Sequence, residues 1–340
     1  MKVKLKPLTQ QVIVITGATS GIGLATAKLA ARRGAKVVLN SRNEGELQRI
    51  ADELRNDGGD VSYCAADVAD SLAMEAVADK AINDYGRIDT WINNAGVSIY
   101  GRLDEVPLEE KRRLFDVNFW GVVHGCRAAL PHLKKTGGAI INIGSALSER
   151  VLPLQGMYCA SKHAVKAYTD ALRMELEKDK APISVTLIKP AAIDTPYTLH
   201  ARNHLEKVPT NPPPVYSAQV AADAILYCAE HPMRDIFVGG SAKLFSLLET
   251  IAPRLTDKYM ERTMFKQQQT KQRANPLHKD ALYSIVDREG DIEGAYSGHV
   301  MKSSVYTSAV LHPVRSAALA ALAVAAATMA FYVFKPMRMT

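Results

Sequence analysis

The sequence predicts an α/β fold built on a doubly wound parallel sheet of about seven strands with helices on both faces. Two observations support this prediction. Between residues 11 and 240, short β-branched runs alternate with longer segments of helical period, and a glycine cluster follows the first run. The expected strands are 11–16, 36–40, 61–67, 88–95, 138–145, 183–190 and 235–240. Among the intervening segments, 21–34 is expected to be a helix ended by Gly34, and 161–179 a long amphipathic helix.

Composition favours a packed protein and excludes several classes of function. Of 340 residues, 47% are hydrophobic and 23% charged, which is ordinary for a globular chain. The net charge of +7 is spread along the sequence without a dense basic run, so no nucleic-acid partner is expected. The four cysteines have no Cys-x-x-Cys spacing, so we predict no metal site and no disulfide framework. The apolar run near the N-terminus is too short for a signal peptide, and a cytoplasmic catalytic domain is expected.

The chain is expected to divide into three parts. Residues 1–240 form the catalytic domain, and the proline-rich stretch 195–216 is long enough to be a substrate loop or lid. Residues 241–311 form an extension that begins helical and continues irregular, without further strands. Within it, 279–309 is polar and expected at the surface. Residues 312–340 form a hydrophobic tail.

The tail contains nineteen uncharged residues, 316–334, with basic residues on both sides. As a helix this segment would extend roughly 28 Å at ~1.5 Å per residue, about the thickness of a bilayer core. Three aromatic residues gather at its end, as in an interfacial belt. Its high alanine content fits a second interpretation equally, a helix packed on the domain or on another subunit. The sequence therefore predicts either a transmembrane or membrane-associated helix or a packed one.

The glycine cluster Thr16–Gly23 lies between the first expected strand and the first expected helix. Gly17 and Gly21 allow a tight turn and close approach to a pyrophosphate, and Gly23 allows close helix packing. The helix N-terminus offers free N–H groups to phosphates. A glycine cluster alone is often only a turn, but this position between strand and helix favours dinucleotide binding.

The end of the second strand bears on which dinucleotide is bound. An acidic residue there would bind the ribose 2′-hydroxyl of NAD, whereas an arginine accommodates the 2′-phosphate of NADP. This chain has Ser41 and Arg42 at that point and no carboxylate. NADP(H) is therefore the expected cofactor, and the alternative is an ordinary surface arginine.

Further motifs follow in a recognisable order: Asn-Asn-Ala-Gly at Asn93–Gly96, then Asn118, Ser145 and the Tyr-x-x-x-Lys pair Tyr158 and Lys162. Together with the glycine loop they resemble the short-chain dehydrogenase/reductase family over about residues 9–240. The resemblance implies a Rossmann-type fold, a small carbonyl or alcohol substrate and a homo-oligomer, dimeric or tetrameric.

The resemblance also implies roles for individual residues. The catalytic residues would be Asn118, Ser145, Tyr158 and Lys162, with Asn118 holding a kink and a water in the proton path. The cofactor would contact Gly17, Thr19, Ser20, Gly21, Ile22, Gly23, Ser41, Arg42, Asp67, Val68, Asn94, Ala95, Gly96, Tyr158, Lys162, Pro190, Ile193 and Thr195. Asp67 and Val68 would meet the adenine. Ala191 stands where the family has glycine, so we expect slightly reshaped nicotinamide contacts there.

The spacing of Tyr158 and Lys162 suits proton transfer. Residues i and i+4 of a helix lie on one face, so both side chains can enter one cleft. A free tyrosine has a pKa near ~10, so we expect Lys162 to lower the pKa of Tyr158 by ~3, worth about 4 kcal/mol. Tyr158 would then protonate a carbonyl oxygen that Ser145 polarises. The alternative is an exposed pair without a task.

The sequence thus predicts an NADP(H)-dependent carbonyl reductase or alcohol dehydrogenase for an apolar or lipid-like substrate. A rival prediction is a non-catalytic NADP(H)-binding regulator or scaffold at a membrane, and a third is that 241–340 is mainly an interaction module. Trp91 and Trp120 are expected in the core, and His124 and His163 at surface or satisfied core positions.

Overall fold

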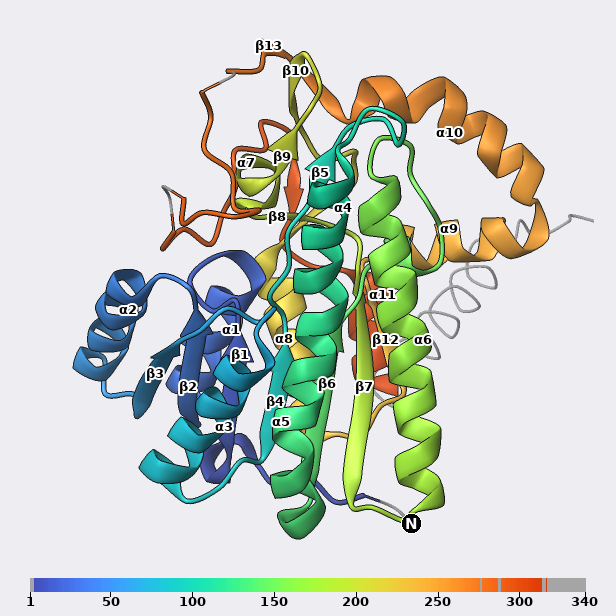
Figure 1. Ribbon diagram of the computed structural model, residues 1–340. Helices are drawn as coiled ribbons and strands as arrows, with labels where there is room; N and C mark the ends of the chain where they lie inside the picture. Colours follow the sequence, from blue (N-terminus) through green and yellow to red (C-terminus); the bar gives the residue numbers. More distant parts are fainter. Residues whose placement is uncertain (1–2, 276, 287–288, 314–315, 317–340) are drawn as a thin grey trace, which may run out of the picture.

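The computed structural model describes residues 3–275, 277–286, 289–313 and 316 (Figure 1). Its main sheet has seven parallel strands in the order β12-β7-β6-β4-β1-β2-β3. The strands are β1 (Val12–Thr16), β2 (Lys36–Ser41), β3 (Val61–Ala65), β4 (Thr90–Asn93), β6 (Gly138–Ile143), β7 (Ile183–Pro190) and β12 (Asp235–Val238). All seven lie where the sequence predicted strands, and the predicted fold class is confirmed.

Helices cover both faces of this sheet (Figure 1). One face carries α1 (Gly21–Arg32), α2 (Glu44–Asn56) and α8 (Ala218–Glu230), and the other carries α3 (Ser71–Tyr85), α4 (Leu108–Phe115), α5 (Gly121–Thr136) and α6 (Gly156–Lys178). Each face has its own core cluster. In β1, Ile13 and Ile15 belong to one cluster, and Val12 and Val14 belong to the other. Because successive side chains of β1 enter opposite core clusters, both faces of this central strand are apolar.

The strand order reverses between β1 and β4, because the chain goes from β1 outward through β2 and β3 before returning to β4. In open α/β sheets, ligands bind beyond the carboxyl ends of the strands at such a reversal. The glycine turn after β1 and the Asn93–Gly96 segment after β4 both lie at this point.

The remaining elements surround that end of the sheet. Small sheets are formed by β5 (Ile99–Tyr100) with β9 (Arg202–Asn203), by β8 (Ala192–Asp194) with β11 (Val215–Ser217) and β14 (Val300–Met301), and by β10 (Lys207–Pro209) with β13 (Gln269–Arg273). The helices are α7 (Tyr197–His200), α9 (Gly240–Ile251), α10 (Pro253–Gln267) and α11 (Val305–Leu311). Two short 3₁₀ turns, Leu8–Gln10 and Ala146–Ser148, and a π-helical turn, Asp116–Trp120, complete the described elements.

Three sequence predictions about the extension and core need correction. Strands do not stop at Gly240: β13 and β14 pair with strands of the 195–216 loop. β13 is polar and β14 has only two residues, so neither leaves a periodic apolar pattern. The 279–309 segment is not confined to the surface, because Leu282 is fully buried. Trp91 is in the core as predicted, but Trp120 is 48% exposed.

No helix within the described ranges is both long and apolar enough to cross a membrane. The predicted segment 316–334 lies outside the described residues except for Ser316. Its two interpretations therefore stay predictions.

Candidate active site

The glycine loop after β1 forms the floor of the candidate cofactor site. Gly17 has φ +64°, and a Cβ there would lie 2.8 Å from the Ala95 Cα. A Cβ on Gly23 would lie 2.0 Å from the Gly17 carbonyl oxygen, and Gly21 has φ +53°. Glycine is therefore required at each position, by conformation at two and by space at Gly23. Such a bare backbone cradle at a helix N-terminus fits a pyrophosphate.

The segment after β4 holds this loop in place. The Asn94 side chain donates to the carbonyl oxygens of Thr16 and Gly17, each at 3.0 Å. The N–H groups of Asn94 and Ala95 donate to Thr16 Oγ1 at 3.0 and 3.1 Å. Asn94 thus fixes the geometry of the glycine loop. An amide suits this position because its nitrogen can donate to both loop carbonyls.

Asn118 lies in the π-helical turn between α4 and α5, a kind of irregularity that often bends a helix, and the kink expected at Asn118 stays a prediction. Its side chain is fully buried; Oδ1 accepts from the Val97 N–H at 2.8 Å, and Nδ2 donates to the Val97 carbonyl and to Ser161 Oγ. Asn118 therefore joins the start of α6 to the segment after β4. A role in proton relay stays a prediction.

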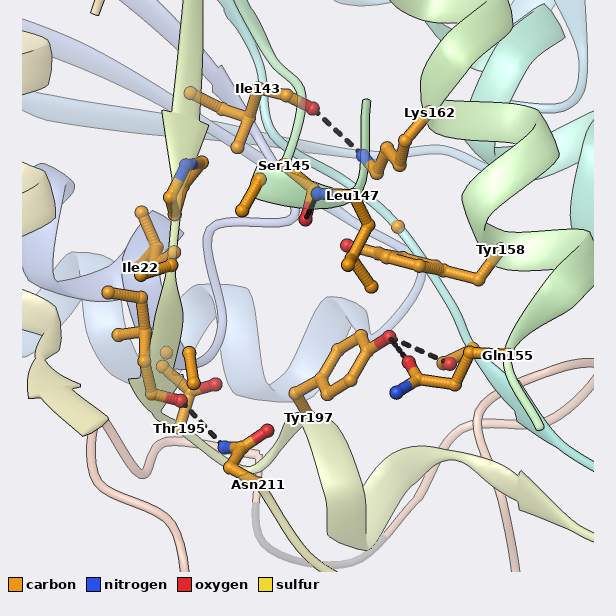
Figure 2. Close-up of a pocket in the computed structure, with 18 of the residues that line it drawn as sticks. Ile22, Ile143, Ser145, Leu147, Gln155, Tyr158, Lys162, Thr195, Tyr197 and Asn211 are labelled. Atoms are coloured by element: carbon orange, nitrogen blue, oxygen red, sulfur yellow. Dashed lines mark hydrogen bonds between the residues drawn. The ribbon is translucent and has the colours of Figure 1, made fainter. Parts of the chain in front are cut away.

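Ser145, Tyr158 and Lys162 meet at one cavity of about 310 Å³, as Figure 2 shows. Ser145 follows β6 and caps a 3₁₀ turn, where its Oγ accepts from the Leu147 N–H at 3.0 Å. Lys162 lies one turn after Tyr158 on α6, and its Nζ donates to the Ile143 carbonyl at 2.8 Å. The Nζ lies 5.7 Å from the centre of the Tyr158 ring. The helical spacing thus places both groups in one cleft.

The electrostatics of this pair differ from the prediction. Burial raises the pKa of Tyr158 to about 12, although hydrogen bonding with Ser145 and Tyr197 works the other way. Burial also lowers the pKa of Lys162 to about 8. In the protein alone the pKa of Tyr158 is therefore raised, not lowered as expected, because burial disfavours the charged phenolate.

The other cavity residues include some that the sequence did not single out. The Tyr197 ring stands edge-on to that of Tyr158 with centroids 5.4 Å apart, and its hydroxyl lies 2.9 Å from Gln155 Oε1 (Figure 2). Tyr197 comes from the 195–216 loop, so that loop does border the site. A tyrosine in an irregular loop has no spacing signal, and only its nearness in sequence to Thr195 could have suggested it.

The extension supplies one wall of the cavity. Its residues there are largely apolar and come mainly from α9 and α10, with one from the later segment: Ser241, Ala242, Phe245, Tyr259, Met260, Met264 and Ala281. Arg150, buried at the cavity edge, fastens these helices through ion pairs with Glu249 of α9 and Asp257 of α10. The Gln268 side chain donates to the Pro153 carbonyl at 2.9 Å. The extension is therefore part of the active-site architecture.

The residues after β7 reach the cavity without strain. Pro190, Ile193 and Thr195 line it, together with five residues of the glycine loop: Gly17, Thr19, Ser20, Gly21 and Ile22. Gly23 is not among the lining residues. Ala191 is not among the residues with positive φ, and its N–H donates to the Val238 carbonyl at 2.8 Å. The expected conformational cost of alanine at this position is therefore absent, because its φ is not positive.

The residues expected to hold the adenosine are arranged differently from those of the catalytic end. Ser41, Arg42, Asp67 and Val68 are not part of the cavity lining. Arg42 Nη2 donates to the carbonyl oxygens of Ala281 and Ser284, and Asp67 is paired with Arg113, a residue that the sequence analysis missed. The structure thus brings these residues together around a segment of the chain's own extension.

Comparison with known proteins agrees with this geometry. The family model described as short chain dehydrogenase matches residues 11–206. An uncharacterized oxidoreductase, YxnA, of Bacillus subtilis (strain 168) is 45% identical over 323 residues, which cover 94% of this chain and 90% of the relative. That match includes most of the extension.

Two solved structures resemble the core. A short-chain dehydrogenase/reductase from Burkholderia phymatum in complex with NAD has TM-score 0.67 and 28% identity, covering 74% of this chain and 97% of its own. An alcohol dehydrogenase from Thermococcus sibiricus complexed with 5-hydroxy-NADP has TM-score 0.59 and 28% identity, covering 67% and 95%.

The chain therefore belongs to the short chain dehydrogenase family. It is an oxidoreductase of this type that uses a nicotinamide cofactor and acts on CH–OH or C=O groups. One of the two solved structures carries NAD and the other an NADP analogue, so the pair favours neither cofactor for this chain.

Proposed function

We propose that the protein is an NADP(H)-dependent carbonyl reductase or alcohol dehydrogenase for an apolar or lipid-like substrate, with Tyr158 as general acid and base. One observation supports this most strongly. The hydroxyls of Ser145 and Tyr158 and the ammonium of Lys162 share a cavity with the glycine loop, and the rest of its wall is largely apolar.

In the proposed reduction the bound cofactor supplies a hydride to the carbonyl carbon, and the protein handles the oxygen. The Tyr158 hydroxyl donates its proton to that oxygen as negative charge develops there. Ser145 is suited to donate a hydrogen bond to the same oxygen, because its Oγ already accepts one from the Leu147 N–H. Lys162 would bind the nicotinamide ribose and favour the phenolate that remains after transfer.

The cavity wall supports an apolar substrate. Phe245, Met260 and Met264 from the extension face the same space as Tyr158. Contact with aromatic and methionine side chains removes apolar ligand surface from water. Binding here therefore stabilises an apolar substrate more than a strongly hydrated one. Gln155 and Asn211 add a few polar groups that can orient one end of such a ligand.

Arg42 supports the choice of NADP(H). It follows β2 directly, and no carboxylate ends that strand. Its Nη1 is buried without a hydrogen-bond partner among the described residues, so the guanidinium retains donors for a phosphate.

The test uses absorbance to measure NADPH oxidation with a panel of steroid, retinoid, fatty and aromatic carbonyls and of hydrophilic sugars. We expect turnover of apolar carbonyls and loss of at least about 100-fold in Tyr158→Phe with NADPH binding retained. Tyr227→Phe on α8 is the matched control and should behave as wild type. Activity on sugars alone would contradict the substrate class. NADPH binding without turnover across the panel would favour the non-catalytic binder.

Membrane attachment through 316–334 and assembly into a dimer or tetramer are further proposals. Deleting 312–340 and following the protein between membrane and supernatant fractions tests the first. Light scattering tests the second. A protein that stays in the supernatant with its tail intact would contradict attachment.

A further inference from the structure

Part of the extension lies against the residues expected to hold the adenosine half of the cofactor. We call residues 281–286 and 289–294 the strap. The strap contacts three parts of the expected dinucleotide site: the 2′-phosphate position, the adenine position and the phosphate-binding turn.

The first contact is with Arg42. Its Nη2 donates to the carbonyl oxygens of Ala281 at 2.6 Å and Ser284 at 2.9 Å. Two carbonyl oxygens on one guanidinium nitrogen resemble the oxygens of a phosphate, which is the group proposed for this arginine. The strap therefore occupies one of the two terminal guanidinium nitrogens that a 2′-phosphate bound through both would use, and Nη1 stays without a partner among the described residues.

The second contact is at the expected adenine position. The Leu282 side chain is fully buried, with a relative exposure of 0%, and belongs to the core cluster that includes Val68 and Leu114. Its carbonyl accepts from Arg113 Nε at 3.0 Å, and Arg113 also pairs with Asp67. The strap is thus bound to the arginine that pairs with Asp67, and the Leu282 side chain is buried in the same apolar cluster as Val68.

The third contact is with the phosphate-binding turn. The Gly21 N–H, at the start of α1, donates to the Asp291 carbonyl at 2.9 Å, and the Gly290 N–H donates to the Thr19 carbonyl at 2.7 Å. The N–H groups at this helix start are those that a pyrophosphate would use. The Asp291 carbonyl of the strap accepts a hydrogen bond from one of these N–H groups, that of Gly21.

Glu289 adds a charge to the same region. Burial raises the pKa of its carboxyl, whereas the neighbouring Asn43, Arg42 and Thr19 side chains favour its charged form. Its Oε2 is buried without a hydrogen-bond partner among the described residues. An anionic group beside Thr19 and Arg42 stands close to the place proposed for the 2′-phosphate.

We propose that the strap occupies the adenosine half of the dinucleotide site in the free enzyme and that the cofactor binds by displacing it. This proposal rests on the proposed function, because it assumes that Arg42, Asp67 and the glycine loop serve a dinucleotide. The strap is then a built-in competitor that lowers apparent cofactor affinity while leaving the catalytic end open. A strap docked nine-tenths of the time lowers the apparent affinity about tenfold.

Gly290 offers a way to release the strap without touching a cofactor residue. Its φ is +98°, and a Cβ there would lie 2.4 Å from Glu46 Oε1 and 2.7 Å from Arg49 Nη2. A β-branched residue is strongly disfavoured at this φ, so Gly290→Val should detach this end. Leu282→Ser removes the buried side chain at the other end. Leu277→Ser, at a position 87% exposed just before the strap, is the matched control.

The experiment is calorimetric titration of the full-length protein and the three variants with adenosine 2′,5′-bisphosphate, which reaches only the adenosine half, and with NADPH. We expect Gly290→Val and Leu282→Ser to bind both about tenfold more tightly than wild type, and Leu277→Ser to bind like wild type. Thermal melting checks that each variant is folded. Two independent variants keep the test decisive if one fails to fold.

Unchanged or weaker binding in the folded variants would overturn the strap proposal, and weaker binding would mean that the strap holds the cofactor in place. If wild type and variants bind neither NADPH nor NADH, the proposed function falls, and the strap proposal falls with it. If wild type binds NADPH and the variants bind it no better, only the strap proposal falls.

Discussion

The two halves of the candidate cofactor site differ in what occupies them. At the catalytic end, Ser145, Tyr158 and Lys162 border an open cavity. At the adenosine end, Arg42 and Gly21 already have partners from the strap. The family motifs supply both ends, but the extension contributes a wall to one and an occupant to the other. The same fold can therefore be ready for chemistry at one end and obstructed at the other.

The largest expected effect falls on the catalytic end and leaves the adenosine end unchanged. Lys162→Met removes the Nζ that donates to the Ile143 carbonyl, and with it the cation beside Tyr158. We expect kcat/KM for reduction to fall about 100-fold or more, because the phenolate loses its stabilising charge. Binding of adenosine 2′,5′-bisphosphate should stay as in wild type. Lys166→Met, one turn further along α6 and partly exposed, is the control. A matching loss of adenosine-bisphosphate binding would show that the two ends are not independent.

A smaller effect is expected in the apolar wall. Phe245→Ala on α9 should raise KM for an apolar carbonyl about tenfold, because the ring's apolar surface is lost from the cavity. Steady-state kinetics with one long-chain and one small carbonyl would measure it, and the small substrate should respond less. Leu247→Ala, on the same helix but 49% exposed and outside the cavity lining, is the control. Equal changes for both substrates would argue against a substrate-binding wall.

Glu289→Gln should act on the adenosine end alone. Removing the charge beside Arg42 weakens strap docking and also removes repulsion toward a 2′-phosphate. We expect NADPH to bind several-fold more tightly and NADH to change less, measured by fluorescence titration. Glu293→Gln, an exposed strap residue, is the control. Loss of NADH binding would instead make Glu289 a ligand of the ribose 2′-hydroxyl, and the cofactor preference would need revision.

The smallest change is expected in the pH profile of reduction. Reduction needs a protonated Tyr158, and its pKa is raised to about 12, so the phenol keeps its proton throughout the neutral range. The rate with NADPH should therefore vary less than about twofold between roughly pH 5.5 and 7. It should fall above about pH 8, because burial lowers the pKa of Lys162 to about 8 and its charge is lost there. Alcohol oxidation, which needs the phenolate, should rise with pH over the same neutral range. Stopped-flow rates in both directions check this. A reduction rate that falls with an apparent pKa near 7 would contradict it.

The difference between the two ends also shows what the sequence could predict. The seven strands, the glycine turn and the Tyr158–Lys162 pair follow from local patterns, because strand alternation and helical spacing are set by neighbouring residues. The strap does not, since its contacts join residues far apart in the chain that no periodicity links: 169 positions separate Leu282 from Arg113, and 239 separate Ala281 from Arg42. For the same reason Arg113 and Tyr197 were missed. The pKa of Tyr158 was mispredicted because pairing with Lys162 is visible in the sequence and the depth of burial is not.

Hydrogen exchange of the Gly290 amide tests the relation between the two ends most directly. In the free enzyme this N–H donates to the Thr19 carbonyl at 2.7 Å and should be protected. If the cofactor displaces the strap, saturation with NADPH will make this amide exchange faster, while amides of β6 next to Ser145 keep their protection. Slower exchange of the Gly290 amide with NADPH bound would contradict displacement and would show that strap and cofactor occupy the site together.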